Sequence, residues 1–232
     1  MSLFDRMRRA LRENRGFVAF LLLFGLFRTA VADWNPIPSG SMHPTLLEGD
    51  VVFVNRLAYD LKVPLTDHIL LHLGDPQRGD IVTFSSPRDG TRLIKRLVAI
   101  PGDKVEMRNK LLFINGEAAT YQDHYQSATV DPSHDALDAP WQVQHTLETA
   151  GGHAHPIQWL AGIAGRDNFK PVTLGPNQYL MLGDNRDNSA DSRFIGLVSR
   201  ELLIGKAVRV MVSADITGNW MPRLERFGQA LI

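Results

Sequence analysis

Ser41 is the first candidate nucleophile, because it lies in a segment whose composition restricts the backbone. It follows Gly40 and is surrounded by three prolines, Pro36, Pro38 and Pro44. Prolines hold the chain, while a glycine lets other atoms approach closely. A nucleophile needs this kind of fixed and accessible position. A simple linker has the same composition, so the residue types alone leave both interpretations open.

A serine hydroxyl is a weak nucleophile until a base takes its proton, and two residues are candidates for that base. His43 lies on the same side as Ser41 if the chain is extended, but no acidic residue is obviously placed to orient it. Lys95 lies in a strand-like run, where a period of two surrounds it with apolar residues such as Leu97. Burial disfavours the charged amine and lowers its pKa, as a lysine base requires. The alternatives are a lysine on an edge strand, or burial of Arg96 with a carboxylate instead.

A third polar segment, Gly183 to Arg193, follows an apolar strand-like run. Its density of Asp, Asn, Arg and Ser predicts a network of side-chain hydrogen bonds. A calcium loop built on Asp184, Asp187 and Asp191 is an alternative. The segment lacks the central glycine and the late glutamate of an EF-hand loop, which weakens that interpretation.

The elements that must position these residues are mostly strands. Short apolar runs alternate with turn residues, and no amphipathic helical pattern is sustained after residue 45. The expected strands are Val51–Asn55, Ile81–Ser85, Arg92–Ile100, Lys104–Arg108, Leu111–Ile114, Gln178–Leu182 and Ala207–Val212. The predicted fold class is therefore mostly β, an antiparallel catalytic domain that follows one N-terminal helix.

Residues 117–170 differ from the rest of this domain, because the strand signal fades and five of the eight histidines gather there. They predict an inserted smaller region of loops and strands. A metal site is an alternative, but only His153 and His155 have a spacing that loosely resembles a ligand pair.

The N-terminus predicts a membrane anchor with a defined orientation. An apolar run from Phe17 to Ala32 is preceded by five arginines, and after Arg28 no further Lys or Arg occurs until Arg56. Basic residues accumulate on the cytoplasmic side, so we expect the N-terminus in the cytoplasm and the remaining domain across the membrane. A cleavable secretory signal ending at Ala32 and a buried soluble helix are the alternatives.

Composition excludes several other classes of protein. Lys plus Arg and Asp plus Glu number 25 each, so the basic excess of a nucleic-acid-binding protein is missing. The chain has no cysteine, which excludes a disulfide scaffold and a thiolate metal site. The apolar share of 44% is that of an ordinary folded domain.

Taken together, the three segments resemble the bacterial type I signal peptidases, or leader peptidases. The family's nucleophile motif is similar to Pro38–Leu46, its lysine motif to Ile94–Val105, and its third motif to Gly183–Arg193. Three motifs in the same order are highly specific. The resemblance covers roughly residues 16–116 and 171–212, and does not extend into the insertion in detail.

The resemblance implies a role for each matching residue. Ser41 corresponds to the nucleophile and Lys95 to its general base, while Ser189 helps to orient the lysine. The Ser39 hydroxyl and the Ser41 backbone N–H correspond to the oxyanion hole. The residues expected to support the site through ion pairs are Arg96, Asp184, Asp191 and Arg193. No metal or organic cofactor is expected.

The resemblance also implies the substrate and the location. The substrates would be signal-peptide-bearing preproteins, cut after small residues at −1 and −3, at the bacterial cytoplasmic membrane. The expected organisation is a cytoplasmic N-terminus (residues 1–15), an anchor (16–32), a periplasmic catalytic domain (33–116 and 171–232) and an insertion (117–170). Trp220 and Met221 would contact either lipid or the domain itself. Some family members have two membrane segments before the catalytic domain, where one is expected here, and some have a disulfide, whereas this sequence contains no cysteine.

Two rival functions remain at this point. One is a self-processing or conjugation-type Ser-Lys protease with a dedicated substrate, which would use the same pair of residues. The other is an anchored β domain that only binds partners, although that function leaves the three polar segments unexplained.

Overall fold

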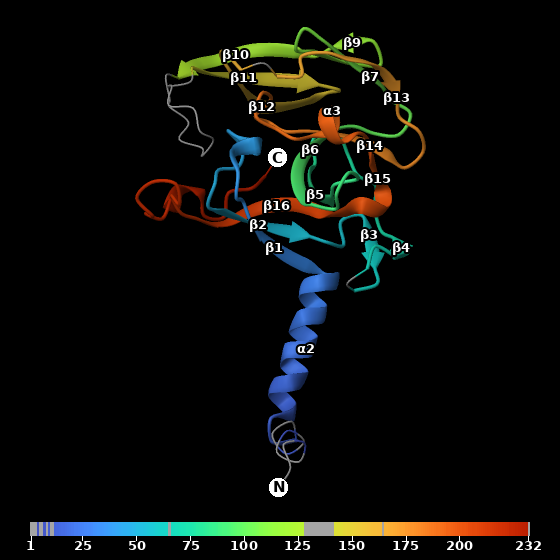
Figure 1. Cartoon of the computed structure of the whole chain (residues 1–232), viewed down its shortest axis with the longest axis vertical. Coiled ribbons are helices and arrows are strands. Elements are labelled where there is room, and N and C mark those ends of the chain that lie inside the picture. Colours follow the sequence, from blue (N-terminus) through green and yellow to red (C-terminus); the bar gives the residue numbers. More distant parts are fainter. Residues whose placement is uncertain are drawn as a thin grey trace.

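Strands dominate the structure, a computed structural model that describes residues 12–64, 66–127, 142–163 and 165–231, together with residues 4, 7 and 9. Figure 1 shows one long helix projecting from a domain of strands. The helices are α2 (Arg15–Ala30), α3 (Ser192–Ile195) and the short 3-10 turns η1 (Gly40–Met42), η2 (Arg200–Leu202) and η3 (Leu224–Arg226). The strands are β1 (Ala32–Pro36), β2 (Asp50–Asn55), β3 (Asp60–Lys62), β4 (Ile69–His72), β5 (Ile81–Ser85), β6 (Arg92–Ala99), β7 (Lys104–Arg108), β8 (Leu111–Ile114), β9 (Glu117–Ala118), β10 (Thr120–Ser127), β11 (Val143–Ala150), β12 (His153–Leu160), β13 (Phe169–Thr173), β14 (Gln178–Leu182), β15 (Val198–Ser199) and β16 (Leu203–Ser213).

The strands of the described residues form four antiparallel sheets. The largest has the order β1-β2-β16-β5-β6-β14-β15, and a second has the order β13-β7-β8-β9. Strands β10, β11 and β12 form a third sheet, and β3 pairs with β4. The predicted mostly-β antiparallel fold is therefore confirmed.

Strand β6 has a central position in the large sheet, between β5 and β14. Its residues from Lys95 to Ala99 are all buried, so both faces of the strand are covered. The sequence left open whether Lys95 or Arg96 is buried. Both are, because alternate residues of a strand covered on both faces point into opposite buried layers.

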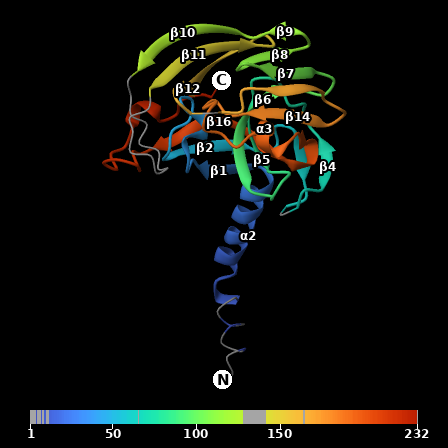
Figure 2. The ribbon, with the colours of Figure 1, turned by 45° about the horizontal axis from the view of Figure 1, so that its top comes forward.

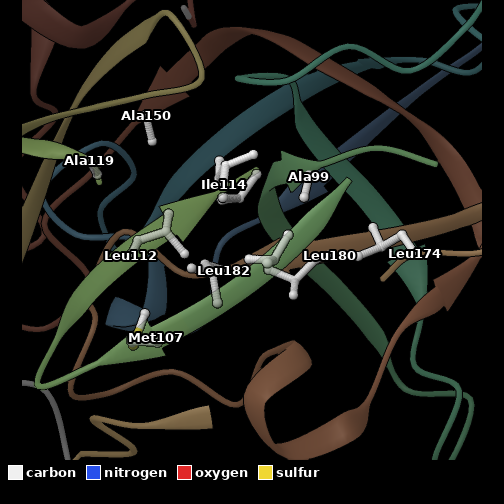
Figure 3. Close-up of a cluster of buried hydrophobic side chains, with 11 residues drawn as sticks. Ala99, Met107, Leu112, Ile114, Ala119, Ala150, Leu174, Leu180 and Leu182 are labelled. Carbon is white, nitrogen blue, oxygen red and sulfur yellow. The ribbon is translucent and has the colours of Figure 1, made fainter. Parts of the chain in front are cut away.

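Apolar side chains from the two larger sheets meet in one core cluster, which Figure 3 shows. It contains Ala99 from β6, Leu182 from β14, and Met107 and Leu112 from β7 and β8. A second cluster lies under the Ser41 loop and joins Ile37, Met42 and Leu46 to β2, β5 and β16. The loop that carries Ser41 is thus attached directly to the hydrophobic core.

Helix α2 differs in length from the prediction. It ends at Ala30, because Ala32 begins strand β1 and pairs with Asn55 of β2. Among the described residues, no helix combines the length and the apolarity needed to cross a membrane. The junction is held by Arg28, which stacks 4.5 Å from the centre of the Trp34 ring and forms an ion pair with Asp33. Two of the five N-terminal arginines, Arg6 and Arg8, lie outside the described residues.

Residues 117–170 contain more strand than predicted. Strands β10, β11 and β12 form their own sheet at the end of the domain away from α2, as Figures 1 and 2 show. The edges of this region pair with the second sheet instead, since β9 joins β8 and Phe169 in β13 pairs with Met107. Of the five clustered histidines, His134 lies outside the described residues, and the side chain of His124 is not described either.

Candidate active site

Ser41 is presented by the short turn η1, between strands β1 and β2. The turn is closed by the His43 N–H, which donates to the Gly40 carbonyl at 3.0 Å. The next residue, Met42, is fully buried in the core cluster beneath it. An apolar anchor next to a partly exposed serine fixes the position of the hydroxyl, which the proline-rich composition alone only suggested.

Lys95 reaches this serine from β6. Its Nζ donates a hydrogen bond to Ser41 Oγ at 2.6 Å and a second one to the Ile94 carbonyl at 2.9 Å. The side chain is almost completely buried. The structure therefore brings the predicted nucleophile and the predicted base into direct contact over 54 residues of sequence separation.

Burial lowers the pKa of Lys95 from its ordinary value of 10.5 to about 8. Removal of water disfavours the charged amine, while the carboxylates of Asp191 and Asp184 act in the opposite direction and raise the pKa. The loss of hydration is the larger effect. A substantial fraction of the amine is therefore neutral near pH 8, as a general base must be.

A cleft of about 490 Å³ opens beside the pair. Ser39, Ser41 and Lys95 line one part of it, and Ile216 and Thr217 from the C-terminal segment line another. The Ser39 hydroxyl is exposed and lies 3.5 Å from Ser41 Oγ. The cleft can therefore admit an extended peptide to the serine from solvent.

The third polar segment packs directly against the Ser41 loop. Asn185 donates from Nδ2 to the Gly40 carbonyl at 3.0 Å and from its backbone N–H to the Ser41 carbonyl at 3.2 Å. A side chain at Gly183 would not fit, since an added Cβ would lie 2.5 Å from the Ser41 carbonyl oxygen. The segment thus determines where the serine lies without contacting its hydroxyl.

Two buried ion pairs support this packing. Arg96 donates from Nε and Nη2 to the two carboxylate oxygens of Asp184, both at 2.9 Å. Arg193 likewise donates hydrogen bonds to both carboxylate oxygens of Asp191, each at 2.8 Å. Burial alone would raise the pKa of both carboxyl groups, but the guanidinium partners hold each pKa below its ordinary value.

These pairs also bear on the calcium alternative. Asp184 binds Arg96, Asp191 binds Arg193, and Asp187 binds the Lys110 amine at 3.0 Å. Each aspartate is thus oriented towards a different cation. Within the residues that the structure describes, no three His, Asp or Glu side chains are grouped as a metal site requires.

Ser189 is buried at 8% exposure beside Gly183. Among the described residues, its hydroxyl makes no hydrogen bond to Lys95, whose amine is bonded to Ser41 and to the Ile94 carbonyl. No hydrogen bond among the described residues therefore supports the orienting role of Ser189, which stays a prediction.

Sequence reasoning missed two features near the site. Arg186 of the third segment binds Glu148 of β11 through two hydrogen bonds of 2.6 Å. His43 donates from Nε2 to Glu48 Oε2 at 2.6 Å, an acidic partner that was not obvious from the sequence. Glu148 lies in a segment without strand signal, and Glu48 lies beyond a turn, which is why neither pairing was visible.

Comparison with known proteins gives a consistent result. The family model described as "Signal peptidase, peptidase S26" matches residues 12–212. A signal peptidase I from Buchnera aphidicola subsp. Schizaphis graminum is 33% identical, over 91% of this chain and 78% of that protein. A signal peptidase I from Pseudomonas fluorescens is 35% identical, over 86% of this chain and 72% of that protein. The crystal structure of a signal peptidase I from Enterococcus faecalis is 31% identical and covers 57% of this chain and 96% of its own, with a TM-score of 0.35.

Proposed function

Since this chain belongs to the signal peptidase family, peptidase S26, we propose that it removes N-terminal signal peptides from exported preproteins with Ser41 as nucleophile and Lys95 as general base. Its relatives carry the name signal peptidase I, and the family consists of serine proteases. The substrate class follows from the family. The assignment of the chemistry to particular residues of this chain is our inference.

One observation carries the assignment. The Lys95 amine lies 2.6 Å from Ser41 Oγ, in a site where burial lowers the lysine pKa to about 8. A neutral amine at this distance can accept the serine proton as the hydroxyl attacks. His43 is the weaker candidate for the base, since its Nε2 is already bonded to Glu48.

The reaction would follow the Ser-Lys form of acyl transfer. Ser41 attacks the carbonyl carbon of the scissile peptide bond while Lys95 takes the hydroxyl proton. The oxyanion is stabilised by the Ser41 backbone N–H and the Ser39 hydroxyl. Protonated Lys95 then gives its proton to the leaving amine, and a water deprotonated by Lys95 releases the signal peptide from Ser41.

We further propose a supporting set around this pair, in which the Arg96–Asp184 and Asp191–Arg193 ion pairs hold the third segment in place. Ser189 would help to orient Lys95. Substrate selection would use the cleft, where an extended chain places alternate side chains in shallow pockets.

The proposed location is the bacterial cytoplasmic membrane, with α2 as the anchor and the catalytic domain on the outer side. In support, α2 has no buried residue, and Phe17, Leu22 and Leu23 are each more than 60% exposed. Ala32 is buried and paired in β1, which disfavours cleavage after this residue. The domain beyond α2 would consist of the catalytic sheets and an inserted region centred on β10, β11 and β12.

The test is cleavage of a preprotein by the full chain in detergent. Ser41→Ala and Lys95→Ala should each lower kcat/KM by at least about 1,000-fold. Ser85→Ala and Lys104→Ala make the same side-chain changes outside the cleft and should retain activity. Wild-type activity in either active-site variant would exclude the proposed mechanism.

A further inference from the structure

A second polar pair, His43 and Glu48, lies in the candidate active site and has no role in the mechanism above. The His43 Nε2–H donates to Glu48 Oε2 at 2.6 Å, and both side chains are mostly buried. Glu48 also lines the cleft together with Ser41 and Lys95. Any role of the pair must therefore be exerted next to the reacting groups.

The position of Glu48 is fixed by the turn that carries it. The turn is closed by Asp50, whose carboxylate accepts a hydrogen bond from the Leu47 N–H at 2.9 Å. Arg223 donates to the Glu48 backbone carbonyl at 2.9 Å and pairs with Asp215, which precedes the cleft residues Ile216 and Thr217. The backbone of Glu48 is thus held between the Ser41 loop and the C-terminal wall of the cleft.

The pair lies against the backbone of Gly40. A Cβ added to Gly40 would come within 2.9 Å of Glu48 Oε1 and 3.1 Å of His43 Cε1. Gly40 separates Ser39 from Ser41, the two residues proposed to donate to the oxyanion. A carboxylate therefore lies behind the loop that must stabilise a developing negative charge.

An uncompensated carboxylate at this position would oppose the reaction, because it repels the oxyanion in a partly desolvated site. Among the described residues that line the cleft, the charged ones are Glu48 and Lys95. Lys95 must be neutral at the moment of attack, so it cannot balance Glu48 then. The Glu48 carboxylate is bonded instead to His43 Nε2 at 2.6 Å, and this ring carries a balancing positive charge when it is protonated.

We infer that His43 is the counter-ion of Glu48 and that the pair keeps the oxyanion loop both positioned and electrically neutral during acyl transfer. This inference rests on the proposed function. It assigns His43 a positioning role through Glu48, not a direct role in proton transfer. It also gives a reason for a glycine at position 40, where a side chain would collide with the pair.

The inference is tested by a double-mutant cycle on the full chain, with kcat and KM measured on a preprotein. His43→Ala and His43→Gln should each lower kcat by on the order of tenfold while KM changes by less than about twofold. In the Glu48→Gln background, His43→Ala should change kcat by less than about twofold, because no charge is left to balance. His72→Ala, which removes a similar histidine–aspartate pair on β4, should leave kcat unchanged.

Two results would overturn the inference. One is wild-type kcat in His43→Gln, which keeps a hydrogen-bond donor but loses the positive charge. The other is an equal loss from His43→Ala with and without Glu48→Gln. His43→Gln also serves in the cycle if His43→Ala does not fold. If the wild-type chain cleaves no preprotein, or if Ser41→Ala cleaves equally well, it is the proposed function that fails instead.

Discussion

At the scale of single residues, the protonation state of Lys95 should control the rate. The folded protein lowers the pKa of this amine from 10.5 to about 8, and the neutral form is the proposed base. kcat/KM should therefore rise with pH, by about tenfold between pH 7 and pH 9, with a midpoint near 8. A flat profile over this range, or a midpoint near the ordinary lysine value, would contradict the assignment of the base. The profile is measured on the wild-type chain in detergent, with Ser41→Ala as the blank.

Breaking the buried Arg96–Asp184 pair should strongly lower the stability of the folded protein. Both side chains are 1% exposed, so Asp184→Asn leaves a buried guanidinium without its counter-ion. We expect a loss of about 3–5 kcal/mol in the free energy of unfolding. Asp75→Asn is the matched control, because Asp75 binds Arg200 while being 81% exposed, and it should cost less than about 1 kcal/mol. Urea unfolding of both variants gives the comparison, and similar losses would show that burial is not the decisive difference.

The residues that the sequence singled out and those that it missed differ for a physical reason. Ser41, Lys95 and the aspartates lie in short segments whose composition is itself unusual. The His43–Glu48 pair depends on a turn that folds Glu48 back under Gly40, and no local pattern encodes this approach. The hydrophobic periodicity of the sequence therefore could not predict the pairing of His43 with Glu48 across this turn.

At the scale of elements, Gly183 should be needed to keep the third segment against the Ser41 loop. An added Cβ would lie 2.5 Å from both the Ser41 carbonyl oxygen and Ser189 Cβ, so the segment or the serine has to move. A displacement of about 1 Å is enough to lower kcat/KM by about 100-fold. Gly25→Ala is the control, since nothing lies within 4 Å of its added Cβ. Unchanged activity in Gly183→Ala would show that this contact does not position Ser41.

The strand predictions succeeded where the local sequence defines the strand. Strands β5, β7, β8 and β14 have the predicted bounds, because apolar residues and flanking turn residues define them locally. Strand β11 was missed because its inner face buries the polar residues Thr146 and Glu148, so hydrophobic alternation is absent. Glu148 is neutralised by Arg186, which comes from the distant third segment. A strand stabilised by such a partner has no hydrophobic signal of its own.

At the scale of the whole molecule, α2 and the catalytic domain should be separable. Helix α2 has no buried residue, whereas the next element, β1, buries Ala32 and pairs with β2 along its whole length. Deletion of residues 1–30 should therefore retain cleavage of a soluble peptide but abolish flotation with lipid vesicles. Deletion of residues 1–36 is the matched control, and it should also lose the folded domain because it exposes the edge of β2. If the shorter deletion still floats, exposed residues such as Trp220 and Met221 would attach the domain to lipid, and α2 would not be the main anchor.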